Sequence, residues 1–373
     1  MKNFAEVQAA LATVWGELPA LLGDGLVAFE ARLLPLLREL EAQPANPARV
    51  EAVLALLEAD YPAVYERLVE SLAAEKAPAV KFRGTAGAVK PTVGRYLVVP
   101  VWYATDRKNT GAAAPAERYS GDKGKLQFGK VEVSIPDSHE KGLLEKPSLF
   151  RLQFRADPEK HVVLLSLEQA DAAAWKAELE QALAGCDSHD ALLFIHGFNV
   201  GFEDAARRAA QFAHDLEFQG VPLLYSWPSE GKTLAYTIDE DNALWTVDDF
   251  EEVMKTLLTE VGAKRLHVVA HSMGNRVLTE GLRRIDVAAL PAGAAKLHEV
   301  VFAAPDVNAD TFRNFVAKFY GRAQRFTLYA SKGDKALETS QKLHKYPRAG
   351  DAGDGVVLCE GLETVDATAV DQT

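Results

Sequence analysis

The chain has 373 residues, 48% hydrophobic and 25% charged, which is the composition of an ordinary globular protein with a large core. A formal net charge of −12 argues against a nucleic-acid partner, because phosphate binding needs clustered lysine and arginine. Cys186 and Cys359 form neither a disulfide framework nor a metal-binding spacing. The N-terminus shows no signal-peptide pattern, and no stretch reaches the roughly 18 apolar residues of a transmembrane helix. We therefore expect a cytoplasmic protein.

The first 76 residues are predicted to be purely helical. Apolar residues recur there at helical spacing in four segments separated by glycine or proline. These segments are 4–18, 26–40, 50–57 and 62–72. Short amphipathic helices with short connections predict a small bundle, which we expect to be removable without unfolding the rest. The bundle contains no histidine or cysteine, so we interpret it as an adaptor or docking module for a protein partner.

Residues 77–94 are rich in alanine, glycine and proline and are predicted to be a linker. In residues 95–373, apolar strands alternate with helices, which predicts a mostly parallel sheet with helices on both faces, an α/β fold. Strands are expected at 96–103, 130–135, 150–154, 162–166, 191–195, 223–226, 266–270, 300–304, 325–330, 356–359 and 363–365. Helices are expected at 170–183, 202–218, 247–261, 273–284 and 309–318. Residues 106–125 are polar and rich in glycine, which favours a surface loop.

The most informative stretch is 268–274, which reads VVAHSMG. An apolar strand ends, a serine follows between small residues, and a helix begins at once, which is the layout of a nucleophile elbow. Because that turn is strained, the positions two before and two after the serine must be small, and here they are Ala270 and Gly274. We interpret Ser272 as a nucleophile held with a positive φ. The alternative is a chance Ser-x-Gly in a strand-to-helix turn.

A second turn that could serve the same reaction follows the strand at 191–195. His196 and Gly197 come directly after that strand, and a glycine lets the backbone approach a substrate closely. We assign an oxyanion hole to the backbone amides of Phe198 and Met273, which are expected to converge on one point. Two fixed donors can each supply roughly 3–4 kcal/mol of transition-state stabilisation. We expect His196 to tie the loop down by hydrogen bonding and not to act as a base.

A serine nucleophile of this kind works with a histidine base and an acidic residue that orients the histidine, and these two residues are harder to place. Asp334 follows the strand at 325–330, and the order serine then aspartate is the expected one for this fold. Asp306, one strand earlier, is the rival acid, and its other interpretation is a helix N-cap or turn residue. No histidine follows the last expected strand, so the base is either His344 or a histidine beyond residue 373. The other interpretation of His344 is a surface residue beside Lys342 and Lys345. Without a base, we expect this chain to be a poor esterase.

From about Tyr96 onward, the chain resembles a bacterial α/β-hydrolase family of unassigned function in the esterase and lipase superfamily. The matching segments are 103–107, 128–136, 194–199, 226–231, 270–278, 304–306 and 329–334. The resemblance implies a serine hydrolase with Ser272 as nucleophile, supports Asp334 as acid, and implies a Gly-His segment after the last strand that supplies the base. Residues 1–76 lie outside this pattern and resemble helical adaptor modules found in front of effector enzymes in bacterial defence systems.

Two functions are therefore open. The first is a serine hydrolase acting on carboxylic esters or related acyl compounds, either small molecules or lipids, with no cofactor and no metal. The second is a catalytically impaired hydrolase-fold scaffold or effector, whose helical bundle docks protein partners. The intact elbow around Ser272 favours the first function, and the missing base favours the second.

Overall fold

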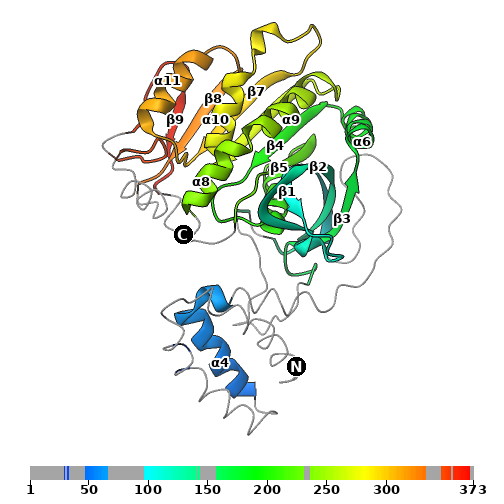
Figure 1. The fold of residues 1–373 in the computed structure, drawn as a ribbon, viewed down its shortest axis with the longest axis vertical. Coiled ribbons are helices and arrows are strands. Elements are labelled where there is room, and N and C mark those ends of the chain that lie inside the picture. The colour runs from blue at the N-terminus through cyan, green and yellow to red at the C-terminus, as the bar shows by residue number, and fades with distance from the viewer. Residues whose placement is uncertain are drawn as a thin grey trace. The chain divides into compact units, whose positions relative to one another are not determined.

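The computed structural model describes residues 29, 32, 47–65, 96–139, 141–142, 157–230, 236–332, 346–353 and 356–369 (Figure 1). The chain divides into two compact units, one formed by residues 1–83 with 145–163 and the other by residues 84–144 with 164–373. Asp334, His344, the expected strand at 150–154 and the expected linker at 77–94 lie outside the described residues. Within the described part, no helix has the length and apolar character needed to cross a membrane.

In the first unit, the described residues confirm the third expected helix as α4 (Pro47–Asp60). Val53 and Leu57, one turn apart, are fully buried on one face of α4. Directly after it, the ring of Tyr61 meets Phe29 edge-on at 4.8 Å between ring centroids. Most of the other expected helices lie outside the described residues, so the four-helix bundle stays a prediction.

In the second unit, the described residues form one nine-stranded sheet in the order β3-β2-β1-β5-β4-β6-β7-β8-β9. The strands are β1 (Tyr96–Asn109), β2 (Tyr119–Pro136), β3 (Val163–Ala170), β4 (Asp190–Ile195), β5 (Val221–Ser226), β6 (Arg265–His271), β7 (Lys296–Ala303), β8 (Arg325–Ala330) and β9 (Glu363–Asp366). β1 pairs with β2 in antiparallel register, while the pairs from β1 through β5, β4, β6, β7 and β8 to β9 are parallel. The mostly parallel sheet is therefore confirmed.

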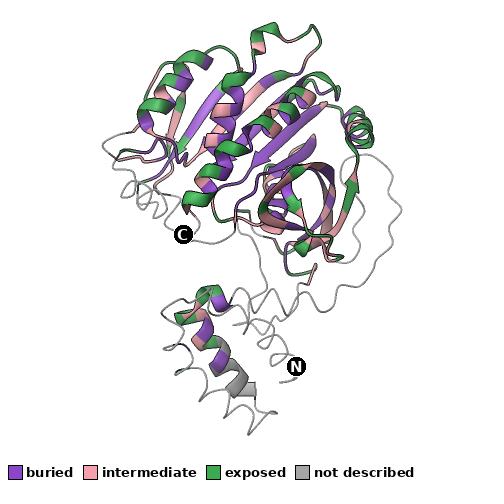
Figure 2. Ribbon diagram, in the orientation of Figure 1, coloured by how far each residue is buried: buried purple, intermediate pink, exposed green. Residues whose placement is uncertain are grey.

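Helices alternate with the parallel strands, as expected from the sequence. They are α6 (Ala172–Ala184), α7 (Phe202–Asp215), α8 (Tyr236–Trp245), α9 (Val247–Thr259), α10 (Gly274–Arg284) and α11 (Ala309–Phe319), with short 3-10 turns η2 (Pro115–Glu117) and η5 (Val287–Ala289). Crossover helices of this kind cover both faces of a parallel sheet, so its central strands are buried throughout. All six residues of β4 and all six of β5 are buried, and Figure 2 shows the buried strands beneath a half-exposed helical layer.

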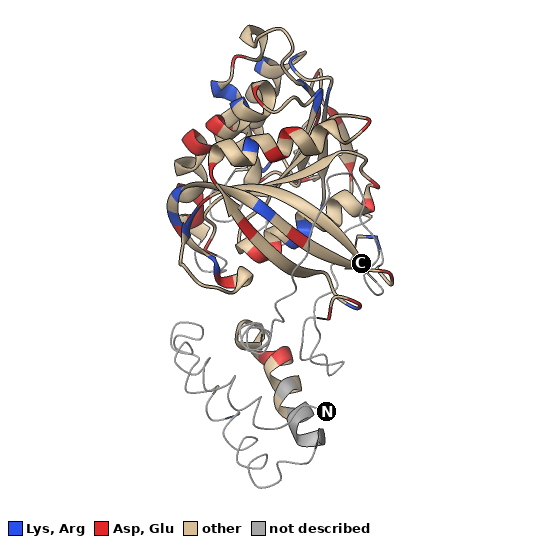
Figure 3. Ribbon diagram, turned by 90° about the vertical axis from the view of Figure 1, so that its right-hand side faces the viewer, with Lys and Arg blue, Asp and Glu red and all other residues tan. Residues whose placement is uncertain are grey.

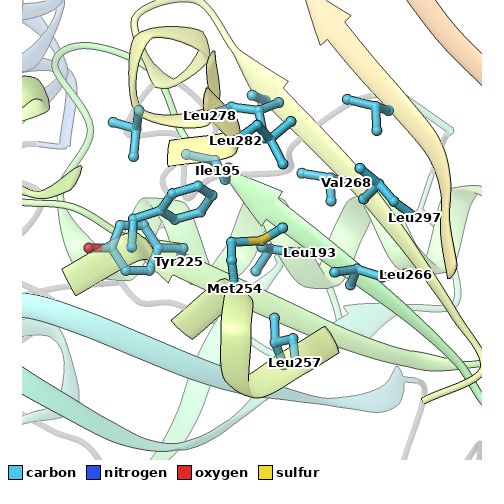
Figure 4. Packing of buried hydrophobic residues seen from close by; sticks show 14 of the residues in the cluster. Leu193, Ile195, Tyr225, Met254, Leu257, Leu266, Val268, Leu278, Leu282 and Leu297 are labelled. Carbon is cyan, nitrogen blue, oxygen red and sulfur yellow. The ribbon is translucent and has the colours of Figure 1, made fainter. Parts of the chain in front are cut away.

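Alternation along β4 divides the core between the two faces of the sheet. Leu193 and Ile195 join a continuous apolar cluster to which α6, α9, α10 and α11 contribute, and Figure 4 shows part of it. The intervening Phe194 faces the other way and stacks on Phe212 of α7, with 6.1 Å between ring centroids. α7 buries mainly alanines, such as Ala209, against this face, so its backbone lies close to the strands. Helices therefore cover both faces, as predicted.

Three expectations need correction. Residues 106–125 are not a loop, because β1 continues to Asn109 and β2 begins at Tyr119, with register shifts on either side of Arg107. Residues 356–359 form no strand. Helix α8 was not expected, because its polar sequence has no clear apolar stripe; its buried residues are Asp239, Asn242 and Ala243. Figure 3 shows acidic and basic residues interspersed on the same elements.

Candidate active site

Ser272 is the first residue of a two-residue turn, Ser272-Met273, between β6 and α10. β6 ends at His271 and α10 begins at Gly274, and Ser272 has a φ of 48°. A non-glycine residue in this region stores roughly 1–3 kcal/mol of strain and persists only where its surroundings fix it. Here the Ser272 amide donates to the Ala303 carbonyl at 2.9 Å, and the Ser272 carbonyl accepts from the amides of Asn275 and Asp306 at 3.1 and 3.2 Å. The expected strained turn is confirmed.

Two glycines allow the chain after β4 to lie directly against this turn. A Cβ on Gly274 would stand 2.3 Å from the His196 carbonyl oxygen, and a Cβ on Gly197 would stand 2.9 Å from the Cβ of Ser272. Both contacts are closer than any side chain tolerates, so both positions need glycine. The carboxyl ends of neighbouring parallel strands meet at one edge of a sheet, and β4 and β6 are neighbours. The loop at 197–200 therefore lies beside Ser272.

The amides assigned to the oxyanion hole belong to Phe198 in this loop and to Met273 at the start of α10. Among the described residues, neither amide donates a hydrogen bond to a protein acceptor. Met273 is fully buried and is the N-cap residue of α10, so its N–H belongs to the positive end of the helix. Two unused donors beside a strained serine are what an oxyanion hole requires. Their convergence on one point stays a prediction.

Arg107 is the group that holds the loop at 197–200 in place. Its side chain is 1% exposed and donates to the Val200 carbonyl at 2.6 Å and to the Ser229 carbonyl at 2.8 Å. It also donates from Nε to the Ser226 hydroxyl at 2.9 Å. One planar guanidinium thus joins β1, the end of β5 and the loop at 197–200, because its donors point in fixed directions.

Burial lowers the pKa of Arg107 to about 10, while the carboxylates of Asp106, Asp239 and Glu230 act in the opposite direction. The guanidinium is therefore still charged at neutral pH. Asp106 is itself completely buried, and accepts from Lys123 Nζ at 2.8 Å and from the Thr246 hydroxyl at 2.7 Å. These charges are compensated inside the fold, as buried charges must be.

Asp239 of α8 holds the far side of the same loop. Its carboxylate accepts from the Ser229 hydroxyl at 2.5 Å, from the Glu230 amide at 2.8 Å and, at 3.4 Å, from the amide of Asn199. Asn199 has a φ of 58°, a conformation that asparagine tolerates better than most residues. Arg107 holds this loop at Val200 and Asp239 holds it at Asn199, so both fix the backbone directly after Phe198.

His196 is buried beneath the loop, and its geometry agrees with a structural role. Its ring stacks on Trp227 with 5.0 Å between centroids, and Nδ1 lies 2.8 Å from the Gly197 carbonyl. Nε2 lies 3.1 Å from the Trp227 carbonyl and 3.3 Å from an Arg107 guanidinium nitrogen, so both ring nitrogens are engaged in this network. Burial and the charge of Arg107 hold the pKa of His196 well below its ordinary value.

Asp306 lies behind the elbow, after β7. Its carboxylate is buried and meets the Tyr236 hydroxyl at 2.5 Å, Arg348 Nε at 3.2 Å and an Arg276 guanidinium nitrogen at 3.6 Å. The interpretation of Asp306 as a helix N-cap is wrong. Asn308 is the N-cap of α11, because its side chain accepts from the amides of residues 310 and 311.

The structure thus brings together three of the sequence-predicted site residues: Ser272, Met273 and Phe198. Asp334 and His344 lie outside the described residues, so their roles stay predictions. Sequence reasoning did not assign functions to Arg107 and Asp239. The available signal for Arg107 was an acidic and a basic residue, side by side, at the end of an otherwise apolar strand within a family-like segment.

Replacing Arg107 with lysine is expected to lower kcat for ester hydrolysis by up to about 100-fold with little change in KM. Lysine keeps the charge but lacks the planar fork, so it cannot meet Ser226, Ser229 and Val200 from three separate nitrogens, and a displacement of about 1 Å can cost this much. The matched control is Arg265→Lys, because Arg265 forms a bidentate pair with Asp190 at the opposite end of the sheet. A folded Arg107→Lys protein with unchanged kcat would show that Arg107 does not position the loop.

The comparisons agree with this geometry. A family model described as "Alpha/beta hydrolase of unknown function (DUF900)" matches residues 171–369, more than half of the chain. The match includes β4 with the loop at 197–200, the strand-to-helix turn at Ser272 and the strands through β9. Comparison with curated proteins finds no match. The chain therefore belongs to the family of alpha/beta hydrolases of unknown function (DUF900).

Proposed function

We propose that the chain is a serine hydrolase acting on carboxylic esters or related acyl substrates. The observation that carries the proposal is the strained serine at the strand-to-helix turn, flanked by the amides of Phe198 and Met273, which donate to no acceptor within the described part of the chain. A serine held at positive φ presents its hydroxyl at the edge of the sheet, where a substrate can approach it. The alternative is that Ser272 lies in a strand-to-helix turn by chance. That alternative does not explain why Gly197 and Gly274 let the loop at 197–200 lie against the serine.

In the proposed reaction, the Ser272 hydroxyl attacks the acyl carbon while a histidine accepts its proton. The carbonyl oxygen becomes an oxyanion, which the amides of Phe198 and Met273 stabilise. Protonation of the leaving alcohol by the same histidine releases it and leaves an acyl-serine. A water molecule then attacks this ester by the same sequence, which regenerates the serine and releases the carboxylic acid. We propose Asp334 as the carboxylate that orients the histidine.

For the base we propose His344, because it lies between Asp334 and the last strand, in the chain order expected for this fold. The two histidines described beside the elbow have other contacts. His196 is held beneath the loop, and the Nδ1 of His271 would lie 2.8 Å from a Cβ on Gly197. Both rings therefore contact the loop at 197–200.

The proposed function is tested by assaying the full chain on p-nitrophenyl acetate and butyrate, with p-nitrophenyl phosphate as the counter-substrate. We expect saturable hydrolysis of the two carboxylic esters and none of the phosphate ester, because two neutral amides suit the single oxyanion of an acyl transition state and do not match the double charge of a phosphate. Hydrolysis of neither carboxylic ester above the buffer rate would contradict the proposal and favour the impaired scaffold.

Asp334→Asn is expected to lower kcat by about 10⁴-fold, because an amide leaves the histidine in the wrong tautomer. Asp306→Asn is expected to act on stability instead. It removes the carboxylate that pairs with Arg348, and breaking a buried ion pair costs about 3–5 kcal/mol; Arg276 keeps its closer partner, Glu240. Thermal melts and kcat are measured for both variants. A folded Asp306→Asn protein that loses activity, beside an active Asp334→Asn protein, would reverse the two roles.

A further inference from the structure

A second group of chemistry-bearing residues lies far from Ser272. His139 follows β2, while His214 and Asp215 are the last two residues of α7. α7 begins directly after the loop at 197–200 and runs back along the sheet. At 1.5 Å per residue, its 14 residues place its last turn about 20 Å from that loop. The group is therefore separate from the hydrolase site, and the proposed reaction makes no use of it.

The three side chains point at one another. His139 Nε2 lies 2.6 Å from Asp215 Oδ1, and His214 Nδ1 lies 3.5 Å from the same oxygen. The three potential ligand atoms all lie within 4.8 Å of one another. Tetrahedral zinc with bonds of about 2.0–2.1 Å holds its ligand atoms about 3.3 Å apart. Small side-chain rotations would therefore bring this group to the geometry of a zinc site.

Neighbouring groups prepare the Asp215 carboxylate for this role. Its other oxygen, Oδ2, accepts from the Gly142 amide at 2.8 Å and from the Gln211 side chain at 3.3 Å. These bonds leave Oδ1 facing both histidines, and outer hydrogen bonds of this kind orient ligands in metal sites. The His139 side chain is only 2% exposed, so its ring is already ordered. Much of the conformational entropy that the ligand side chains would lose on binding a metal is therefore already lost in the folded chain.

We propose that His139, His214 and Asp215 bind a divalent zinc ion, with water completing the coordination. Two imidazole nitrogens and one carboxylate oxygen suit zinc and cobalt, whereas calcium and magnesium prefer sites made of oxygen alone. The ion displaces the proton between His139 and Asp215 and joins the segment after β2 to the end of α7. The alternative is that His139 and Asp215 form an ordinary hydrogen bond without a metal. In that case His214 adds little to the stability of the pair.

His214 separates the two interpretations, because it lies outside the short bond and its side chain is 29% exposed. The full chain, stripped with a chelator, is titrated with Co²⁺ while the visible absorbance is followed, and Zn²⁺ is then added as a competitor. We expect one equivalent of Co²⁺ to give the intense visible band of a four-coordinate site, and Zn²⁺ to remove it. His214→Ala is expected to weaken binding at least tenfold, since even outer-shell changes cost about 10–100-fold.

The matched control is His189→Asn, which removes another histidine at the same end of the sheet, and asparagine tolerates its φ of 51°. This variant should bind Co²⁺ as the parent chain does. Circular dichroism in chelator checks that each variant folds, and His214→Gln replaces His214→Ala if that variant does not. The proposal is overturned if the parent chain shows no stoichiometric Co²⁺ binding, or if binding survives in both His214 variants.

Discussion

Replacing Ser272 with alanine is expected to lower kcat for ester hydrolysis by about 10⁶-fold. The variant loses the only atom that forms the acyl-enzyme in the proposed reaction, while it keeps the two amides that support residual catalysis. The turn itself should survive, because its hydrogen bonds come from the backbone of residue 272 and not from the side chain. Alanine and serine also meet a similar steric cost at a φ of 48°.

The control for this variant is Ser188→Ala, which removes a hydroxyl at the amino end of β4 that accepts from the Asp190 amide and donates to the Gln219 carbonyl. It should leave kcat unchanged. Initial rates on p-nitrophenyl butyrate and thermal melts are measured for both proteins. A stable Ser272→Ala protein that keeps more than a few per cent of the parent activity would mean that Ser272 is not the nucleophile.

Replacing His344 with alanine is expected to lower kcat by a similar factor, on the order of 10⁶. Without a base the serine remains a neutral alcohol, which is a weak nucleophile at pH 7, and the leaving alcohol has no proton donor. The loss should fall on kcat rather than KM, because the proposed role of His344 is in proton transfer and not in binding. Lys345→Ala, next to it, is the matched control and should retain activity.

Two other outcomes are informative about the base. Activity that survives His344→Ala but not Ser272→Ala would contradict the role of His344 and assign proton transfer to another histidine. Parent activity no greater than that of Ser272→Ala would support the impaired scaffold instead.

The sequence predicted the elements that local pattern determines. The strand and helix around Ser272 were placed within a residue or two, because an apolar run followed by small residues admits few alternatives. The segment at 106–125 was wrong for a physical reason. Its charged residues indicate a loop when taken singly, but Asp106 and Lys123 pair across the hairpin at 2.8 Å, and Lys123 also meets Asp249 of α9 at 2.7 Å.

The contacts that hold the loop at 197–200 could not be predicted from local sequence pattern. Arg107 is separated from its partners Val200 and Ser229 by 93 and 122 residues, so their contact depends on strand order and register. The order of β1, β5, β4 and β6 differs from their order in the sequence, and this shuffling brings the loop, the arginine and the serine to one edge. Asn308 likewise took the capping role that one interpretation gave to Asp306, two residues earlier.

The most direct test of the central claim is covalent labelling of the full chain with a fluorophosphonate, followed by digestion and mass spectrometry. An activated serine beside an oxyanion hole attacks the phosphorus and displaces fluoride, whereas an ordinary surface serine does not react. We predict one adduct per chain, on the peptide that contains Ser272, and none in heat-unfolded protein. No adduct on the folded chain, or an adduct on a different residue, would contradict the assignment of Ser272 as an activated nucleophile.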